Sequence, residues 1–213
     1  DRRADRHVHE LGHMVLRQAC LQGQEWAQLS PSTALTIAVN VSGKQLQRPD
    51  FVDEVRDILL ETGLPADRLV LEMTESVLIH DTDSILRTLR TIRDMGVRIA
   101  IDDFGTGYSS LSYLHRFPVD ILKIDRSFVE RLSGADAEDS LVQSIVQLGQ
   151  TLQLETIAEG IEEHDQLTAL RRLGCTMAQG YHFGRPGPAD VVSKLVAAAS
   201  PSPSPEPVVA VRA

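Results

Sequence analysis

Polar side chains, most of them of metal-binding types, stand at the ends of six short apolar segments in this chain of 213 residues. Asp102 and Asp103 follow one another directly behind the segment at 98–101. The other five segments carry similar side chains at or just beyond their ends, namely Asn40, Glu72 and Glu75, Lys123 and Asp125, Glu159 and Glu162, and Gln179. If the fold brings these ends together, they form a ring of carboxylates and amides around one lysine.

The chemistry of such a ring follows from its oxygen atoms. Carboxylates this close would repel one another and stay partly protonated unless cations held them. Oxygen ligands with no His or Cys among them suit Mg²⁺ or Mn²⁺ rather than zinc. Two such ions, about 3.5–4 Å apart, form the clamp that phosphodiester hydrolysis uses. The residue types therefore predict a site for two divalent ions that acts on a phosphate ester.

Short segments rich in β-branched residues alternate with amphipathic segments. This alternation predicts the strands and helices that hold the polar side chains in place. The pattern predicts strands at 36–40, 69–73, 98–102, 121–125, 155–160 and 177–183. It predicts helices at 9–26, 51–63, 84–96, 110–117, 140–154, 164–174 and 188–199. Repeated strand–helix units with short connections form a parallel sheet covered by helices. The carboxyl ends of its strands meet on one face, where active sites form.

Each candidate residue also has an explanation that needs no ligand. A single acid at the end of a strand is often the N-cap of the next helix. Lys123 could form a structural ion pair with Asp125, because the two share a face of the strand, and Glu75 could be an ordinary loop acid. Chance is a weaker explanation than a ligand site for the position of all the candidates on one face. In addition, removing Asp102 and Asp103 together from water is costly unless a partner compensates their charges.

The charge balance excludes some classes of partner. With 21 Lys and Arg against 30 Asp and Glu, the net charge is −9 at pH 7. A protein that binds duplex DNA or RNA, or an anionic membrane, would carry clustered positive charge instead. No apolar run approaches the ~20 residues of a membrane-spanning helix, and no apolar leader is visible. We therefore expect a cytoplasmic protein in which Cys20 and Cys175 are reduced.

Several longer strings resemble those of one family of bacterial proteins. The strings are VNVSGKQL, LVLEMTES, IAIDDFGTGYSSLSYLHRFPVDILKIDRSFV, AEGIE and LGCTMAQGYHFGRP. They resemble the EAL-domain family, which comprises bacterial cyclic-di-GMP phosphodiesterases with a (β/α)₈-type barrel. The resemblance runs from about Leu11 to Pro188, most of the chain, and its DDFGTGYSSL block is highly specific.

The resemblance implies metal ligands. Asn40, Glu72 and Asp102 match ligands of a first metal ion in the family. Asp102, Asp103 and Glu159 match ligands around a second ion. The chain is thus expected to provide most of a site for two Mg²⁺ or Mn²⁺ ions.

The resemblance also implies roles in catalysis and support. Glu159 matches a residue proposed to help activate water, and Lys123 matches the lysine that orients water and phosphate. Glu75 matches a glutamate that braces the loop after Asp103, a loop that the family uses in dimerisation. The remaining matches, which support the site or the substrate, are Asp125, Glu162 and Gln179.

The sequence departs from the family pattern at one point. The family takes its name from a Glu-Ala-Leu motif whose glutamate binds the first metal, and this string occurs nowhere in the 213 residues. The family would place it before Asp1, and six predicted strands are two short of an eight-stranded barrel. We therefore expect an α/β fold, a TIM-like barrel of EAL type that is incomplete, at residues 1–199. A Pro/Ser-rich disordered tail is expected at 200–213.

The favoured function is metal-dependent hydrolysis of cyclic-di-GMP to linear pGpG in second-messenger signalling. The missing motif predicts impaired turnover by this chain alone and leaves a second hypothesis open, a non-catalytic receptor for cyclic-di-GMP or a protein-interaction module. A third hypothesis, a zinc peptidase, rests on the H-E-x-x-H pattern of His9 and His13. The open strand edges of an incomplete barrel predict a homodimer or larger oligomer.

Overall fold

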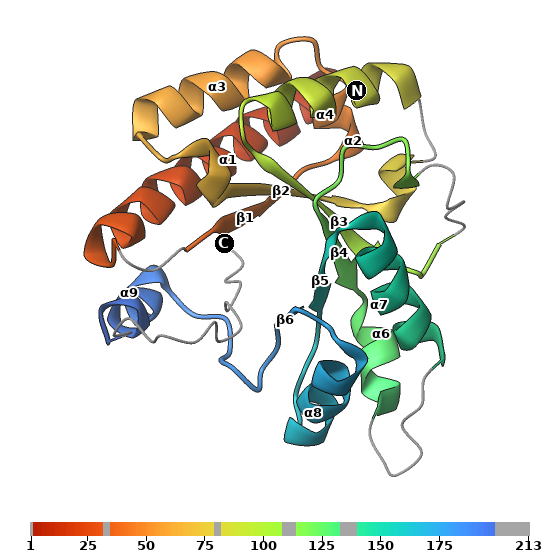
Figure 1. Cartoon of the computed structure of the whole chain (residues 1–213). Coiled ribbons are helices and arrows are strands. Elements are labelled where there is room, and N and C mark those ends of the chain that lie inside the picture. Colours follow the sequence, from red (N-terminus) through yellow and green to blue (C-terminus); the bar gives the residue numbers. More distant parts are fainter. Residues whose placement is uncertain (1, 32–34, 79–81, 108–113, 133–139, 199–213) are drawn as a thin grey trace.

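Six parallel strands form one curled sheet in the computed structural model, which describes residues 2–31, 35–78, 82–107, 114–132 and 140–198 (Figure 1). Each strand pairs with the next one in the sequence. The strands are β1 (Ile37–Asn40), β2 (Leu69–Thr74), β3 (Arg98–Phe104), β4 (Ile121–Ile124), β5 (Glu155–Ala158) and β6 (Met177–Ala178). The predicted α/β fold is confirmed as a half-barrel with its helices on the outside.

Helices connect the strands along the outer side of the sheet. α1, α3 and α4 lie by the β1–β2 half, whereas α6, α7 and α8 lie by the β4–β6 half (Figure 1). The α-helices are α1 (Arg2–Leu29), α2 (Gly43–Leu46), α3 (Phe51–Thr62), α4 (Thr82–Asp94), α6 (Arg126–Val129), α7 (Ser140–Leu152), α8 (His164–Leu173) and α9 (Ala189–Ala198). Short 3-10 turns are η1 (Ala66–Arg68), η2 (Glu75–Leu78) and η3 (Glu130–Leu132). Half of the helix predicted at 110–117, namely residues 110–113, lies outside the described residues.

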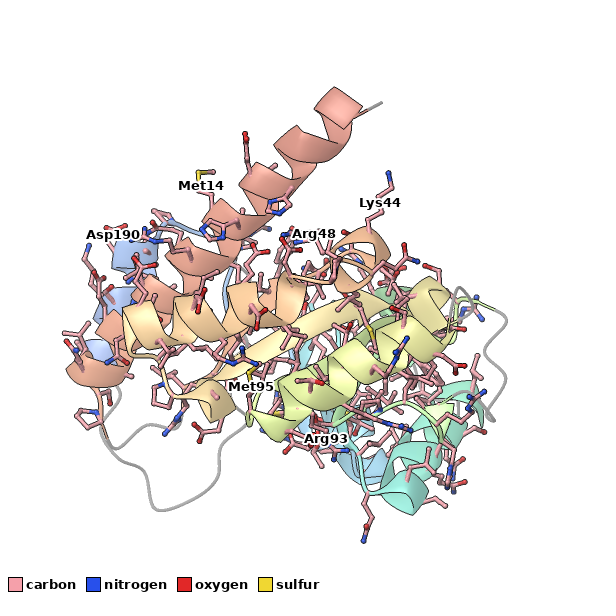
Figure 2. All side chains as sticks on the ribbon, turned by 90° about the horizontal axis from the view of Figure 1, so that it is seen from above. Met14, Lys44, Arg48, Arg93, Met95 and Asp190 are labelled. Carbon is pink, nitrogen blue, oxygen red and sulfur yellow. The ribbon has the colours of Figure 1, made fainter. Side chains whose placement is uncertain are left out.

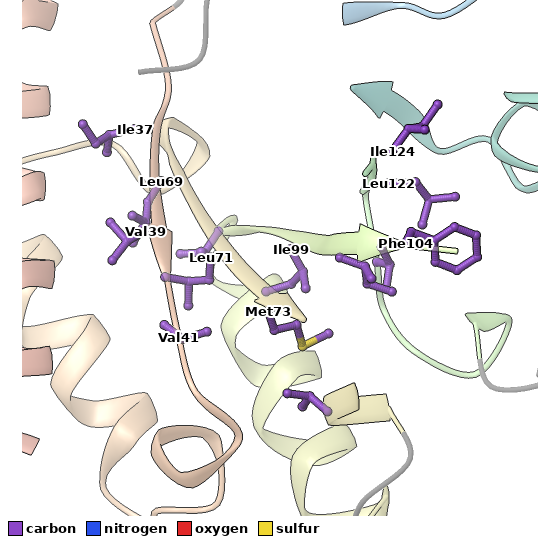
Figure 3. Packing of buried hydrophobic residues seen from close by; sticks show 14 of the residues in the cluster. Ile37, Val39, Val41, Leu69, Leu71, Met73, Ile99, Phe104, Leu122 and Ile124 are labelled. Carbon is purple, nitrogen blue, oxygen red and sulfur yellow. The ribbon is translucent and has the colours of Figure 1, made fainter. Parts of the chain in front are cut away.

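The side chains that point from the sheet toward the helices form the main core. In β2 these are Leu69, Leu71 and Met73, each at most 1% exposed, and they pack with residues of β1 and β3 (Figure 3). Because strand side chains alternate between faces, the residues between them point the other way, into the half-barrel. The core therefore fixes which residues of each strand can reach the interior.

A small apolar cluster lines the interior of the half-barrel. Every strand contributes one residue to it: Ala38, Val70, Ala100, Ile121, Ile157 and Met177. We call this set the apolar inner layer. Stacked layers of side chains from successive strands fill the inside of (β/α)₈ barrels in the same way.

The edges of the sheet are β1 and β6, as the strand count predicts for a barrel short of two strands. The sixth strand is shorter than predicted, because it ends at Ala178 rather than at residue 183. Beyond it, the backbone turns back on itself, and Phe183 N donates to Gly180 O at 3.1 Å. Backbone hydrogen bonds to the segment after β5 nevertheless continue, because Gln179 N donates to Ala158 O at 2.8 Å and His182 N donates to Ile161 O at 2.9 Å.

α1 covers the β1 end of the sheet and packs against β1, α3 and α9. Trp26 of α1 is buried and donates a hydrogen bond from Nε1 to Ser193 Oγ of α9 at 2.9 Å. Although α1 has 28 residues, none of the described helices combines the length and apolar character needed to cross a membrane.

Truncation of a core residue on β2 tests this packing. We expect Leu71→Ala to lower the free energy of unfolding by about 2–5 kcal/mol, because it leaves a cavity between sheet and helices. Leu60→Ala on α3 is the matched control, since Leu60 is 76% exposed, and should cost less than about 0.5 kcal/mol. Urea unfolding followed by circular dichroism measures both, and equal effects would contradict the burial of Leu71.

Candidate functional site

A polar layer stacks on the apolar inner layer at the carboxyl end of the half-barrel. Side chains two residues apart in a strand point to the same face. Two residues beyond each member of the apolar inner layer stand, in turn, Asn40, Glu72, Asp102, Lys123, Glu159 and Gln179. All six were predicted as site residues from the ends of the apolar segments.

Lys123 lies at the centre of the polar layer, with its side chain fully buried. Its Nζ lies 2.8 Å from Glu72 Oε1, 3.0 Å from Asp102 Oδ1 and 2.6 Å from Glu159 Oε1. Burial acts to lower the pKa of this lysine, but the charges of the three carboxylates outweigh burial and raise the pKa above its ordinary value. A charged ammonium group therefore holds the ends of β2, β3, β4 and β5 together.

Asp103 does not follow the alternation of β3. The next residue of a regular strand would point away from Asp102, but the pairing of β3 with β4 shifts register between Ile101 and Phe104. Asp103 also has a φ of 54°, in the left-handed region that few residues other than glycine adopt. As a result, carboxylate oxygens of Asp102, Asp103 and Glu159 all lie within 4.8 Å of one another.

Glu75 braces the segment that follows β3. Its Oε2 accepts hydrogen bonds from the backbone N–H groups of Gly105, at 2.9 Å, and Gly107, at 3.3 Å. Gly105 has a φ of 99°, and a Cβ on Gly107 would lie 2.8 Å from Glu75 Oε1. Glycine is therefore needed at both positions for the contact with Glu75. In the sequence, the pair Gly105 and Gly107 is the feature that indicates this contact.

Asp125 and Glu162 lie beside the polar layer rather than within it. Asp125 is the N-cap of α6, where its Oδ1 accepts a hydrogen bond from Ser127 N at 3.0 Å. Glu162 is exposed and its Oε1 pairs with Arg126 Nη2 at 2.9 Å. The described ion pairs of Lys123 join it to the polar layer and not to Asp125, so the N-cap explanation fits Asp125 better than an ion pair does.

Asn40 and Gln179 stand at the two open ends of the polar layer. The Asn40 side chain is exposed and borders a cavity of about 750 Å³, which Ser42 and Thr74 also line. The amide oxygen of Gln179 is buried and has no hydrogen-bond partner among the described residues. A buried polar atom of this kind is typical of a position that a ligand or a water molecule completes.

His9 and His13 lie far along the sequence from these residues, on α1. His13 Nδ1 lies 3.0 Å from Glu54 Oε1 of α3, within hydrogen-bond distance, and this contact ties the two helices together. Among the described side chains, one group of His, Cys, Asp and Glu is compact enough to hold a metal ion, and it consists of Asp102, Asp103 and Glu159. The zinc-peptidase hypothesis therefore gains no support from the structure.

The acidic group has the donor chemistry that hard divalent cations require. Its ligand atoms are carboxylate oxygens, and Glu72 adds a further buried carboxylate in the same layer. Mg²⁺, Mn²⁺ and Ca²⁺ are bound by such oxygens, whereas zinc and copper favour nitrogen and sulfur. The residues present thus fit a hard divalent ion.

The sequence matches the model of the EAL domain family over residues 3–186, which include all six strands and the whole polar layer. The chain belongs to the EAL domain family. The family comprises cyclic-di-GMP phosphodiesterases, and its solved structures share the barrel fold described above. The resemblance seen in the sequence motifs is thereby confirmed.

Relatives of this EAL domain include proteins with assigned activities. The bifunctional diguanylate cyclase/cyclic di-GMP phosphodiesterase MucR of Pseudomonas aeruginosa is 44% identical over 190 residues, 89% of this chain and 28% of that protein. The MucR phosphodiesterase solved with cyclic-di-GMP has a TM-score of 0.82 and 43% identity, covering 89% of this chain and 76% of its own. The manganese/cyclic-di-GMP complex of Klebsiella pneumoniae BlrP1 has a TM-score of 0.70 and 32% identity, covering 81% and 44%. The chain spans about a quarter of the length of the curated relatives it matches.

Removal of the Lys123 charge tests its place in the polar layer. We expect Lys123→Met to lower the free energy of unfolding by about 3–5 kcal/mol in buffer with a chelator, because it leaves three buried carboxylates without their partner. Since the pKa of Lys123 is raised in the folded state, its contribution is full at pH 7.5 and is lost only as the pH rises through the folded pKa.

The control for this experiment is a lysine on the surface. Lys194 is exposed and pairs with Asp190 on the same helix at 3.6 Å, so Lys194→Met should change the free energy of unfolding by less than about 0.5 kcal/mol. Urea unfolding curves measure the free energy of unfolding of both variants. A Lys123→Met protein as stable as the parent would mean that the polar layer does not depend on this ammonium group.

Proposed function

We propose that this EAL domain hydrolyses cyclic-di-GMP to linear pGpG with the help of divalent metal ions. The observation that carries the proposal is the convergence of Asp102, Asp103 and Glu159 beside the buried ammonium of Lys123. Support comes from MucR, whose name records this activity, and from the MucR and BlrP1 structures that hold the dinucleotide.

The polar layer would hold the ions. Asp102, Asp103 and Glu159 would bind one ion, and Asn40, Glu72 and Asp102 would bind another, with Mg²⁺ and Mn²⁺ as the ions that fit best. When bound, such ions lower the pKa of water and offset the charge of phosphoryl oxygens. Their positive charge also accounts for the binding of an anionic dinucleotide by a protein with a net charge of −9.

Two side chains would take part in the chemical step, Glu159 by accepting a proton and Lys123 by offsetting negative charge. Glu159 would accept a proton at Oε1 from a water molecule placed in line with the phosphorus–oxygen bond that breaks. The water oxygen bonds to phosphorus, the sugar oxygen leaves, and a proton then returns to that oxygen. Lys123 would orient the water and donate a hydrogen bond from Nζ to a phosphoryl oxygen, so that negative charge developing there is offset.

The remaining predicted residues would support this site. Glu75 would keep the Gly105–Gly107 backbone in place behind Asp103, in the loop where the family resemblance predicts a dimer contact. Asp125 would fix the start of α6 next to Lys123. Glu162 and Gln179 would contact the substrate side of the site, and the partnerless amide oxygen of Gln179 is suited to a ligand.

A second candidate function is the binding of cyclic-di-GMP without hydrolysis. It applies to these 213 residues taken alone, which contain no Glu-Ala-Leu string, because the family resemblance assigns a metal ligand to that motif. Such a receptor would keep the affinity that the polar layer provides and lack turnover. Measuring binding and hydrolysis on the same sample separates the two functions.

The activity of the chain tests the proposal directly. We expect conversion of cyclic-di-GMP to pGpG with Mg²⁺ or Mn²⁺, at a rate on the order of 10²-fold or more below that of the MucR phosphodiesterase domain. The reduction follows from one lacking metal ligand, which costs several kcal/mol of transition-state stabilisation. Chromatography of the nucleotide products measures the rate. Binding without any product would favour the receptor, and a rate equal to MucR would show that the motif is dispensable.

Removal of one carboxylate tests the ion site. We expect Asp102→Asn to weaken Mn²⁺ binding by at least about tenfold and to abolish hydrolysis, because a neutral amide binds a hard cation less strongly. Asp94→Asn is the matched control, since Asp94 is exposed at the end of α4. Titration calorimetry with Mn²⁺ measures both, and an unchanged affinity in the Asp102 variant would exclude this assignment.

A further inference from the structure

Arg126 joins the start of α6 to the segment that follows β5. Its Nη2 lies 2.9 Å from Glu162 Oε1, which belongs to that segment, and its Nε lies 2.5 Å from Glu130 Oε1, one helical turn further along the chain. α6 follows β4, and neither β4 nor β5 is an edge strand of the sheet. The connection therefore spans two neighbouring units in the fully paired part of the half-barrel.

The aliphatic part of the Arg126 side chain packs on the backbone of Gly160. A Cβ at Gly160 would lie 2.7 Å from Arg126 Cβ and 2.8 Å from its Cδ, with Cγ closer still. Long charged side chains commonly cover other groups with their methylene stems in this way. A side chain at residue 160 would displace the arginine, so glycine is what permits the close contact. Because Gly160 directly follows Glu159, the contact lies one residue from a candidate metal ligand.

The guanidinium group of Arg126 is held by two carboxylates. The hydrogen bond to Glu130 and the charge of Glu162 raise the pKa of Arg126 above its ordinary value. The positive charge is thus already offset by two negative charges, which suits this arginine poorly for binding the phosphates of a substrate. The two glutamates instead keep the long side chain in one orientation, with its stem across Gly160.

Gly160 is the point at which this segment can change its direction. Before it, Glu159 is fixed to β4, because its N donates to Ile124 O at 3.1 Å and its Oε1 lies 2.6 Å from Lys123 Nζ. Gly160 itself has a φ of 72°, and glycine has access to more backbone conformations than any other residue. A side chain packed across this residue removes part of that freedom.

We propose that Arg126 is a positioning residue for Glu159 and Glu162. It would hold the backbone at Gly160 against α6 and so keep both carboxylates in the orientation that a divalent ion and the substrate require. The part that concerns the ion rests on the proposed function. Arg126 would act through the Gly160 backbone and the Glu162 carboxylate, without touching the reacting atoms. Ligands that are fixed before an ion arrives bind it more tightly, because less conformational freedom is lost on binding.

Hydrogen exchange of backbone amides tests the positioning in the absence of any metal ion. The amides of Glu159, Ile161 and Glu162 donate hydrogen bonds, so their exchange requires local opening. We expect Arg126→Ala to raise these exchange rates at least about threefold, because it removes two ion pairs and the stem contact. Arg126→Lys keeps the charge and a long stem and should stay within about twofold of the parent. Unchanged rates in Arg126→Ala, or equal rates in both variants, would overturn the proposal.

Arg93→Ala is the matched control. The Arg93 side chain is 50% exposed and pairs with Asp120 at 3.1 Å, while that of Arg126 is 51% exposed and pairs with a glutamate at 2.9 Å. Figure 2 shows Arg93 near Met95 at the end of α4, shortly before β3 begins, and therefore at the opposite end of the strands from the polar layer. The control should leave the exchange rates at 159–162 unchanged. A rise as large as that in Arg126→Ala would reflect a general loss of stability and would contradict the proposal.

Titration calorimetry with Mn²⁺ tests whether the positioning reaches Glu159. Loss of a nearby positive charge would by itself strengthen the binding of a cation. We nevertheless expect Arg126→Ala to bind Mn²⁺ at least about threefold more weakly than the parent, because its ligands are less fixed, and Arg126→Lys to stay within about twofold. Faster exchange with unchanged or tighter Mn²⁺ binding would overturn the positioning role. If the parent itself binds no Mn²⁺, the proposed function fails, and the exchange rates alone decide the role of Arg126.

Discussion

The ammonium group of Lys123 is the interaction on which the carboxyl end of this half-barrel depends. It joins Glu72, Asp102 and Glu159, which come from three other segments of the sheet, through ion pairs of 2.6–3.0 Å. Without a cation at this point, three carboxylates at most 9% exposed would face one another in a nearly dry interior. The same lysine that would hold a phosphoryl oxygen during catalysis is thus the counter-charge that lets the acidic site fold.

The second constraint is the irregular backbone at the end of β3. Regular alternation would send Asp103 toward the helices, and the register shift with the left-handed φ of 54° turns it back beside Asp102. Such a conformation costs energy and persists only where its surroundings hold it. The carboxylate of Glu75 supplies part of this support through the backbone of Gly105 and Gly107.

Most of the polar layer was predictable from the sequence because it depends on a local rule. Once 98–102 and its counterparts are recognised as strands, a spacing of two residues puts Asp102, Lys123 and Glu159 on the inner face. The convergence of Asp103 was not predictable in this way, because it arises from the register between β3 and β4. For Asp125 the same rule gives the wrong position. Its spacing from Lys123 predicts the inner face, but β4 ends one residue earlier and the side chain caps α6.

The pairing of each strand with the next in the sequence imposes an order on how the charges come together during synthesis. A chain emerging from the ribosome presents Glu72, Asp102 and Asp103 before Lys123, and Glu159 last. Domains made in this direction can begin to compact from their N-terminal part, but a sheet of β1 to β3 alone would gather acids without their cation. The cation that offsets these acids therefore enters the sheet only with β4, and the last acid of the polar layer follows it with β5.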